Sequence, residues 1–208
     1  MISVVGFGSL LSEVSARETV PALENYRLVR VPGYRRVFDK VGIVFISRHG
    51  ESPDSLELAS CSTEPDPACE IVAAQFECSE EDFLQLYERE HRYRWVEVET
   101  RHYLNGEVTV GRMCTGYADL DYRLNKCVTE AEYHRRVGQY YQGPLWRKDI
   151  LPNPRYLGFC LQAAASQGAD VLDNFLDSSF TADGRSLRDY LAARPELMTE
   201  SPVSYSYR

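Results

Sequence analysis

Three absences restrict the classes to which this 208-residue sequence can belong. It has no long hydrophobic run, since the longest, at residues 43–46 and 71–74, are far shorter than a membrane-spanning helix. It has no excess of basic residues, because its net charge is −8, whereas nucleic acids and anionic membranes bind basic surfaces. No two of its six cysteines form a C-x-x-C pair, the usual core of a zinc or redox site. We therefore expect small molecules or proteins as partners, and neither nucleic acid nor membrane.

The composition is that of a globular protein, with 44% hydrophobic and 26% charged residues, and the length is sufficient for a full hydrophobic core. We predict a single domain over residues 1–195, followed by a polar, tyrosine-bearing tail at residues 196–208. The first residues have neither the basic leader nor the apolar core of a signal peptide, so a cytoplasmic location is expected. In that compartment the cysteines are expected to be reduced and mostly buried. The sequence gives no indication of an oligomeric state.

Local patterns predict strands in the first half of the chain. β-branched and aromatic runs indicate short strands at residues 2–5, 28–31, 36–38, 43–47, 58–61 and 71–78, with an exposed loop at residues 64–67. Asn105-Gly106 is typical of a type I′ turn and predicts a hairpin between strands at residues 92–103 and 107–116. The strands do not alternate regularly with helices, which argues against a parallel α/β sheet.

Helix signals begin at Ser79 and continue through the second half of the chain. Ser79, with Asp82 three positions later, is a variant of the capping box and begins a helix that extends to about residue 91. Further capping patterns and apolar periodicity predict helices at residues 129–141, 154–168, 170–177 and 186–194. The whole order predicts an α+β fold, with a mixed, mainly antiparallel small β-barrel or sheet against which the helices pack.

Glu90 occupies a position where a helix normally places an apolar residue. Large apolar side chains precede it by seven, four and three positions, and these spacings belong to one helical face. Burial of an ionised carboxylate is costly unless the group is paired, hydrogen-bonded or protonated. Glu90 is therefore either a structural ion-pair partner, for example of Arg17 or Arg94, or an acid or base. The helical position alone favours the structural interpretation.

A glycine loop follows the first strand, in the segment Gly6-Phe7-Gly8-Ser9-Leu10. Leu11 occupies the third glycine position of a dinucleotide-binding motif, and the G-x-S-x-G motif of serine hydrolases is absent, so neither site is expected. Two glycines can instead allow backbone N–H groups to point at an anion or a carbonyl oxygen. A tight turn without a ligand is the alternative, and the loop considered alone favours it.

Together these segments resemble the γ-glutamylcyclotransferase-like superfamily. Its members carry a Tyr-Gly-Ser-(Asn/Leu) loop after the first strand, matched by residues 7–10, and a Leu-x-x-x-Glu helix end, matched by residues 86–90. The Arg89-Glu90 pair and the segment at residues 153–157 look most like the glutathione-degrading, cation-transport-regulator-like branch. Two positions depart from the pattern, because Phe7 replaces the usual tyrosine and His91-Arg92 replaces a glycine-rich step.

The resemblance implies a γ-glutamylcyclotransferase, an enzyme that releases 5-oxoproline from glutathione or a γ-glutamyl amino acid when the substrate's α-amine attacks its own γ-carbonyl. It implies no cofactor and no metal, and it implies Glu90 as the acid and base. The substrate-binding residues that it implies are Phe7, Gly8, Ser9, Leu10 and Tyr156. Two alternatives stay open: a non-catalytic module that binds a small ligand on the same fold, and a cyclotransferase that acts on γ-glutamyl-amines.

Overall fold

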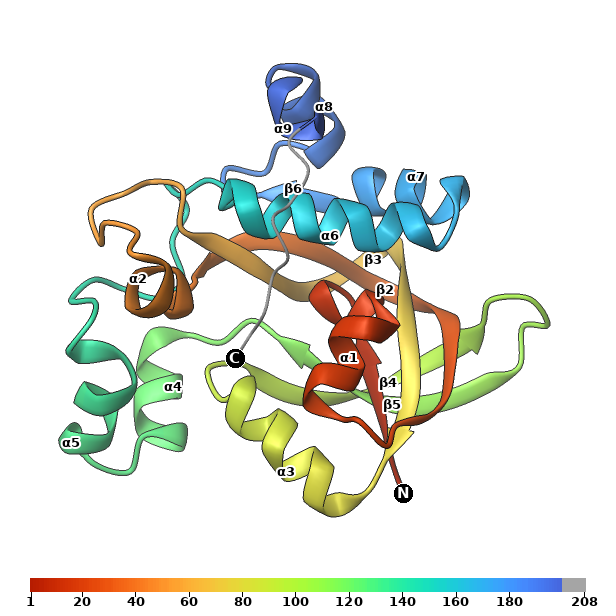
Figure 1. Ribbon diagram of the computed structural model, residues 1–208, viewed down its shortest axis with the longest axis horizontal. Helices are drawn as coiled ribbons and strands as arrows, with labels where there is room; N and C mark the ends of the chain where they lie inside the picture. The colour runs from red at the N-terminus through yellow and green to blue at the C-terminus, as the bar shows by residue number, and fades with distance from the viewer. Residues whose placement is uncertain (200–208) are drawn as a thin grey trace.

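The computed structural model describes residues 1–199, and at its centre lies a closed barrel of five strands (Figure 1). The strands follow the order β3-β1-β5-β4-β2 around the barrel, and pairing of β2 with β3 closes it. Their bounds are β1 Ile2–Gly6, β2 Glu24–Val41, β3 Ala59–Cys78, β4 Arg94–His102 and β5 Val108–Thr115. A short strand, β6 Ser179–Thr181, adds to β2 outside the ring. The β1–β5 pair is parallel and the other pairs within the ring are antiparallel, so the predicted α+β fold and its mixed barrel are confirmed.

The strands β2 and β3 are longer than the sequence predicts. The runs at residues 28–31 and 36–38 are parts of one 18-residue strand, and those at 58–61 and 71–78 are parts of one 20-residue strand. The predicted loop at residues 64–67 is wrong, because Pro65 pairs with Tyr34 inside this ladder. The register shifts between Pro32 and Tyr34, where Gly33 has a φ of 77°. Such an irregularity interrupts the alternation of side chains along the strand. The sequence pattern therefore predicts two short strands where the structure has one.

Residues 43–47 form a helix, α2 Ile43–His49, where the sequence predicts a strand. Gly42 precedes this helix and Gly50, with a φ of 74°, ends it. A Cβ at Gly42 would lie 2.3 Å from the ring of Phe45, so the chain turns tightly at this point. Local β propensity is a weak preference that such tertiary constraints override. Ile43 and Phe45 are buried against the core.

The hairpin of β4 and β5 is confirmed, but its turn is not of type I′. That turn requires a positive φ at both central residues, and only Gly106 has one, at 73°. The Gly106 N–H donates to the His102 carbonyl at 2.9 Å, and the Leu104 N–H donates to His102 Nδ1 at 3.3 Å. The His102 side chain therefore accepts a backbone N–H within the turn, and the turn is wider than type I′.

The helices surround the barrel, and α6 and α7 lie side by side over β3 (Figure 1). Their bounds, with two shorter helical turns, are η1 Ser9–Leu11, α1 Glu13–Thr19, α3 Glu80–Arg89, α4 Asp119–Lys126, α5 Glu130–Tyr133, η2 His134–Gly138, α6 Pro154–Ser166, α7 Ala169–Asp177, α8 Leu187–Ala192 and α9 Glu196–Thr199. The predicted caps are confirmed, since Ser79 Oγ accepts the Asp82 N–H at 3.0 Å and Asn153 Oδ1 accepts the Tyr156 N–H at 3.1 Å. The sequence did not predict α1 or α4.

Two clusters of buried side chains form the core. The larger fills the barrel and the space beneath α6 and α7, and the smaller joins β1 and β3 to α1 and α3. All six cysteines are free, and all except the half-buried Cys69 are buried, as expected. Of the predicted tail, the described part is α9, where Leu197 is buried, and residues 200–208 lie outside the described residues. In the described part of the chain, no helix combines the length and the apolar character needed to cross a membrane.

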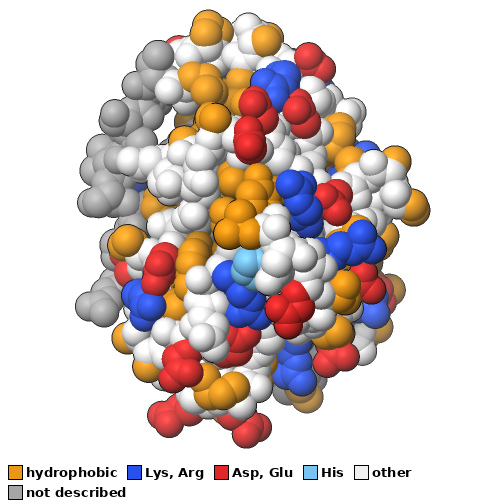
Figure 2. Space-filling model, turned by 90° about the vertical axis from the view of Figure 1, so that its right-hand side faces the viewer, with side chains coloured by type: hydrophobic (Ala, Val, Ile, Leu, Met, Phe, Trp, Pro, Cys, Tyr) orange, Lys and Arg blue, Asp and Glu red, His pale blue; other side chains and the backbone are white. Residues whose placement is uncertain are grey.

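Acidic and basic side chains are intermixed on the face shown in Figure 2. Elsewhere among the described residues, acidic and basic side chains form surface ion pairs, such as Arg188 with Asp173 at 3.0 Å and Arg185 with Asp183 at 3.2 Å. This face therefore carries no continuous basic patch of the kind that binds nucleic acid.

Candidate functional site

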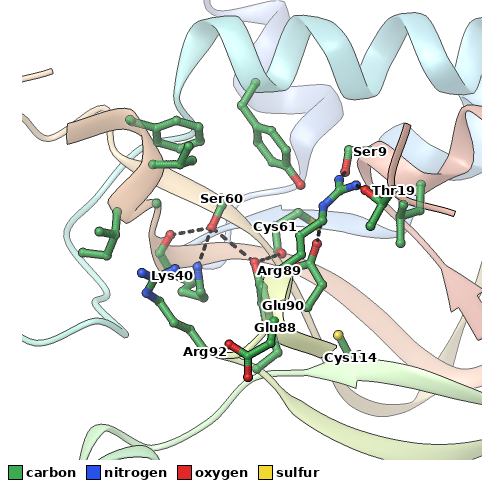
Figure 3. Close-up of a pocket in the computed structure, with 18 of the residues that line it drawn as sticks. Ser9, Thr19, Lys40, Ser60, Cys61, Glu88, Arg89, Glu90, Arg92 and Cys114 are labelled. Atoms are coloured by element: carbon green, nitrogen blue, oxygen red, sulfur yellow. Dashed lines mark hydrogen bonds and ion pairs between the residues drawn. The ribbon is translucent and has the colours of Figure 1, made fainter. Parts of the chain in front are cut away.

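A cavity of about 560 Å³ lies between the loop after β1, the ends of β2 and α3, and the start of α6 (Figure 3). Its volume is in the range of small-molecule sites. The six residues that the sequence selected all line this one cavity, and they are Phe7, Gly8, Ser9, Leu10, Glu90 and Tyr156. Three segments distant in the sequence thus meet at one place.

Glu90 lies immediately after α3, as its C-cap residue with φ −97° and ψ 22°. Because the chain leaves helical geometry here, the side chain turns away from the buried stripe towards the cavity, and 18% of it is exposed. Its Oε1 lies 3.0 Å from Nε of Arg89. The suggested partners are wrong, since Arg17 pairs with Glu13 at 2.7 Å and Arg94 is an exposed residue at the start of β4.

The surroundings of Glu90 are more polar than the apolar face that the sequence predicts. Its charge acts on two buried neighbours, Tyr93 and Cys114. Burial first, and the Glu90 charge second, hold the pKa of each well above its ordinary value, so both side chains stay neutral. The Tyr93 hydroxyl donates to the Cys61 carbonyl at 2.8 Å. These neutral groups form a fixed wall beside the carboxylate.

Arg89 connects Glu90 to the glycine loop and to α1. Besides its ion pair, the guanidinium donates to Ser9 Oγ at 3.2 Å and to Thr19 Oγ1 (Figure 3). A planar guanidinium with several donors in fixed directions holds its partners in a defined geometry. The carboxylate and the loop are therefore held in a fixed relation across the cavity.

Arg36 anchors the glycine loop from inside the barrel. Its side chain is fully buried, and its Nε donates to the Phe7 carbonyl at 2.8 Å. Nη1 donates to Ser178 Oγ at 2.8 Å, Nη2 donates to the Val72 carbonyl, and the guanidinium lies 4.6 Å from the ring centre of Phe175. Burial lowers its pKa to about 10, which leaves it charged near neutral pH. The sequence placed Arg36 in a strand and gave it no role.

Gly8 and Tyr156 lie next to one another in the lining of the cavity. A Cβ at Gly8 would lie 2.9 Å from the Tyr156 hydroxyl, so only glycine leaves space there. The Asn153 cap fixes Tyr156 in the first turn of α6, where 5% of the residue is exposed. Gly6 has a different role, because a Cβ there would lie 2.3 Å from Cβ of Leu10. The two glycines therefore allow the close approach of the loop that the motif suggested.

Lys40 is a second charged residue of the cavity that sequence reasoning missed. It is 5% exposed, its Nζ donates to Ser60 Oγ at 3.2 Å, and it lies 4.5 Å from the ring centre of Tyr93. Burial, followed by the positive charge of Arg92, lowers the pKa of Lys40 to about 7. The sequence carries no signal for this position, since a lysine near the end of a strand is normally solvated. Among residues 1–199, no group of three His, Cys, Asp or Glu side chains is placed to hold a metal ion.

At the level of sequence, the chain matches no family model and no curated protein. Solved structures, by contrast, match its fold over almost the entire chain. One of them is described as a gamma-glutamyl cyclotransferase. Its TM-score is 0.54 and its sequence identity is 13%, and the match covers 99% of this chain and 92% of the other chain. The fold is γ-glutamylcyclotransferase-like.

Two further structures share this γ-glutamylcyclotransferase-like fold. An uncharacterized human protein has a TM-score of 0.53 and 13% identity, covering 100% of this chain and 94% of its own. YkqA from Bacillus subtilis has a TM-score of 0.50 and 11% identity, covering 98% of this chain and 56% of its own. A shared fold carries many functions, so the activity has to be argued from the cavity itself.

Proposed function

We propose that this protein is a γ-glutamylcyclotransferase, which releases 5-oxoproline from a γ-glutamyl compound such as glutathione or a γ-glutamyl amino acid. The observation that carries the proposal is the meeting of Glu90, the glycine loop and Tyr156 in one cavity of this fold. Nucleophile and electrophile belong to the same substrate, so the protein has to fold that substrate and transfer protons.

The proposed reaction needs one carboxylate that first accepts a proton and then donates it. Glu90 takes a proton from the substrate's α-ammonium group, and the free amine attacks the γ-carbonyl carbon to form the ring C–N bond. The bond from that carbon to the leaving nitrogen then breaks as Glu90 donates its proton to this nitrogen. The ring nitrogen gives its second proton to the Glu90 carboxylate, which passes it to the released amine, so the amine leaves as an ammonium ion. Glu90 ends in its starting state, and no oxidant or reductant is required.

The loop and Tyr156 have positioning roles in this proposal. Backbone N–H groups of Gly8, Ser9 and Leu10 are the candidate donors for the substrate's α-carboxylate or for the oxygen of the developing oxyanion. The Tyr156 hydroxyl lies directly beside the loop at Gly8 and limits the space there. Phe7 contributes a ring and its carbonyl, which Arg36 holds, but no hydroxyl.

One observation favours the non-catalytic alternative. Glu90 already has an ion-pair partner, Arg89, so its charge is compensated without any chemistry. A binding module on the same fold would keep this pair for structure alone. The cyclotransferase acting on γ-glutamyl-amines differs from our proposal in the leaving group and not in the role of Glu90.

Incubation with glutathione, a γ-glutamyl dipeptide and γ-glutamyl-ε-lysine, followed by assay of 5-oxoproline, tests the proposal. We expect 5-oxoproline and the free amine in equal amounts from at least one of the first two. Release from γ-glutamyl-ε-lysine alone would favour the γ-glutamyl-amine alternative. Calorimetric binding without product would favour the binding module, and neither binding nor product would contradict both.

Substitution of Gly8 by alanine is expected to reduce kcat/KM by about 10- to 100-fold, because small displacements of positioned groups have effects of this size. The added methyl group would lie 2.9 Å from the Tyr156 hydroxyl and would force the loop and the tyrosine apart. Gly116→Ala is the control, since its Cβ meets nothing closer than 3.6 Å. Equal activities of the two variants would contradict the role assigned to Gly8.

A further inference from the structure

Two cationic side chains lie on the same side of the cavity, and neither has a carboxylate partner. Lys40 Nζ has only oxygen acceptors without charge, Ser60 Oγ at 3.2 Å and the Val41 carbonyl at 3.4 Å. Arg92 donates from Nη2 to the Arg136 carbonyl at 2.6 Å, and its Nε is buried without a hydrogen-bond partner. Within residues 1–199, neither cation has a carboxylate oxygen within 4.0 Å.

Two buried cations without a counter-ion are costly. Burial of a charge without a counter-ion carries a large desolvation penalty, and two like charges repel one another. Both effects are visible here, because burial and the charge of Arg92 are the two largest causes of the lowered pKa of Lys40. Burial likewise lowers the pKa of Arg92. An anion bound between the two side chains would offset both costs.

The two carboxylates whose charges act on Lys40 are engaged elsewhere. Glu90 pairs with Arg89 at 3.0 Å. Asp39 accepts a hydrogen bond from Ser62 Oγ at 2.7 Å and lies 3.7 Å from Lys148 Nζ. These carboxylates affect the charge of Lys40 only at longer range. The position between Lys40 and Arg92 is thus left for a carboxylate that the ligand brings.

Figure 3 shows where such a carboxylate would lie relative to the reacting atoms. Lys40 and Arg92 are on one side of Glu90, whereas Arg89, with Ser9 and Thr19, is on the other. A γ-glutamyl amino acid has the same order of groups, with its α-carboxylate on one side of the reacting amide and the carboxylate of its leaving amino acid on the other. With the glutamyl end at the glycine loop, the second carboxylate points towards the two cations.

We propose that Lys40 and Arg92 form a subsite for the carboxylate of the leaving amine, and hence select γ-glutamyl amino acids and peptides over γ-glutamyl-amines. This inference rests on the proposed function for the orientation of the ligand. The subsite is a property of binding, so it can be tested without turnover.

The test compares γ-glutamylglycine with γ-glutamyl-methylamine, which differ only in the leaving-group carboxylate. Both are titrated calorimetrically into Glu90→Gln, in which we expect them to stay intact. We expect γ-glutamylglycine to bind about 10- to 100-fold more tightly, as is typical of hydrogen bonds to a charged group. Adding Lys40→Met should remove most of this preference. The dissociation constant of γ-glutamyl-methylamine should stay within about threefold of its value in Glu90→Gln alone. Arg92→Met provides a second variant with the same expected direction.

Lys148→Met is the matched control, because it removes the same charge from a side chain that is 72% exposed and outside the cavity. It should leave the preference unchanged. If Lys40→Met weakens both ligands equally, the cations hold the α-carboxylate and the proposal is wrong. Absence of any preference in Glu90→Gln would also overturn it. Carboxylate-dependent binding in a wild-type protein that forms no 5-oxoproline would support the subsite and contradict the cyclotransferase.

Discussion

Glu90→Gln is expected to retain the fold and to lose at least ~100-fold in kcat for 5-oxoproline release, the usual contribution of a positioned acid or base. Glutamine has the shape of glutamate, and its amide oxygen can still accept a hydrogen bond from Arg89. It cannot accept the proton of the substrate's ammonium group. The loss should therefore appear in kcat, with little change in the dissociation constant of the intact substrate.

Glu77→Gln separates this catalytic role from the general loss of an ion pair. The Glu77 side chain is 19% exposed and pairs with Arg27 at 2.8 Å, compared with 18% and 3.0 Å for Glu90 with Arg89. It lies on β3 and does not line the cavity. We expect Glu77→Gln to retain activity, and we expect its melting temperature to stay within a few degrees of that of the wild type. Near-normal turnover by Glu90→Gln would refute the assignment of Glu90 and favour the binding module.

The elements predicted correctly from the sequence are those with a local physical cause. Ser79 and Asn153 cap their helices by contacting residues only three positions later in the sequence. The β4–β5 hairpin forms between adjacent segments. The full lengths of β2 and β3 depend on pairing between segments that are distant in the sequence. A residue pattern shows only the local preference for helix or strand, and strand pairing across the barrel overrides this preference.

The site shows the same division between local and distant information. The glycine loop and Glu90 carry short motifs, and these were sufficient to select residues that share one cavity. Lys40 and Arg36 both lie on the strand β2. In the sequence alone, a basic residue in a strand is expected to be exposed to solvent. Closure of the barrel buries both of them, and no pattern in a single sequence records that closure. The residues that anchor the loop and charge the cavity therefore became visible only in the structure.

Lys40→Met should make the protein more stable below pH 7 by ~1–4 kcal/mol, the range known for buried ion pairs that are replaced by apolar residues of similar volume. The pKa of Lys40 is about 7 in the folded protein, compared with an ordinary value of 10.5. Below pH 7 both the folded and the unfolded chain bind the proton, and the folded chain carries the full penalty of a buried charge. Methionine keeps the length of the side chain and removes this penalty.

The pH dependence distinguishes this explanation from a general packing effect. Between pH 7 and 10.5 the unfolded chain holds a proton at Lys40 that the folded chain has lost, so the wild-type free energy of unfolding rises with pH. The advantage of Lys40→Met should accordingly shrink across this window. Urea unfolding at pH 6 and pH 9 measures it, with Lys148→Met as the exposed control. A variant less stable than wild type at pH 6, or a gap independent of pH, would show that Lys40 is not held as a buried charge. The selectivity of the cavity for a second carboxylate would then lack its physical basis.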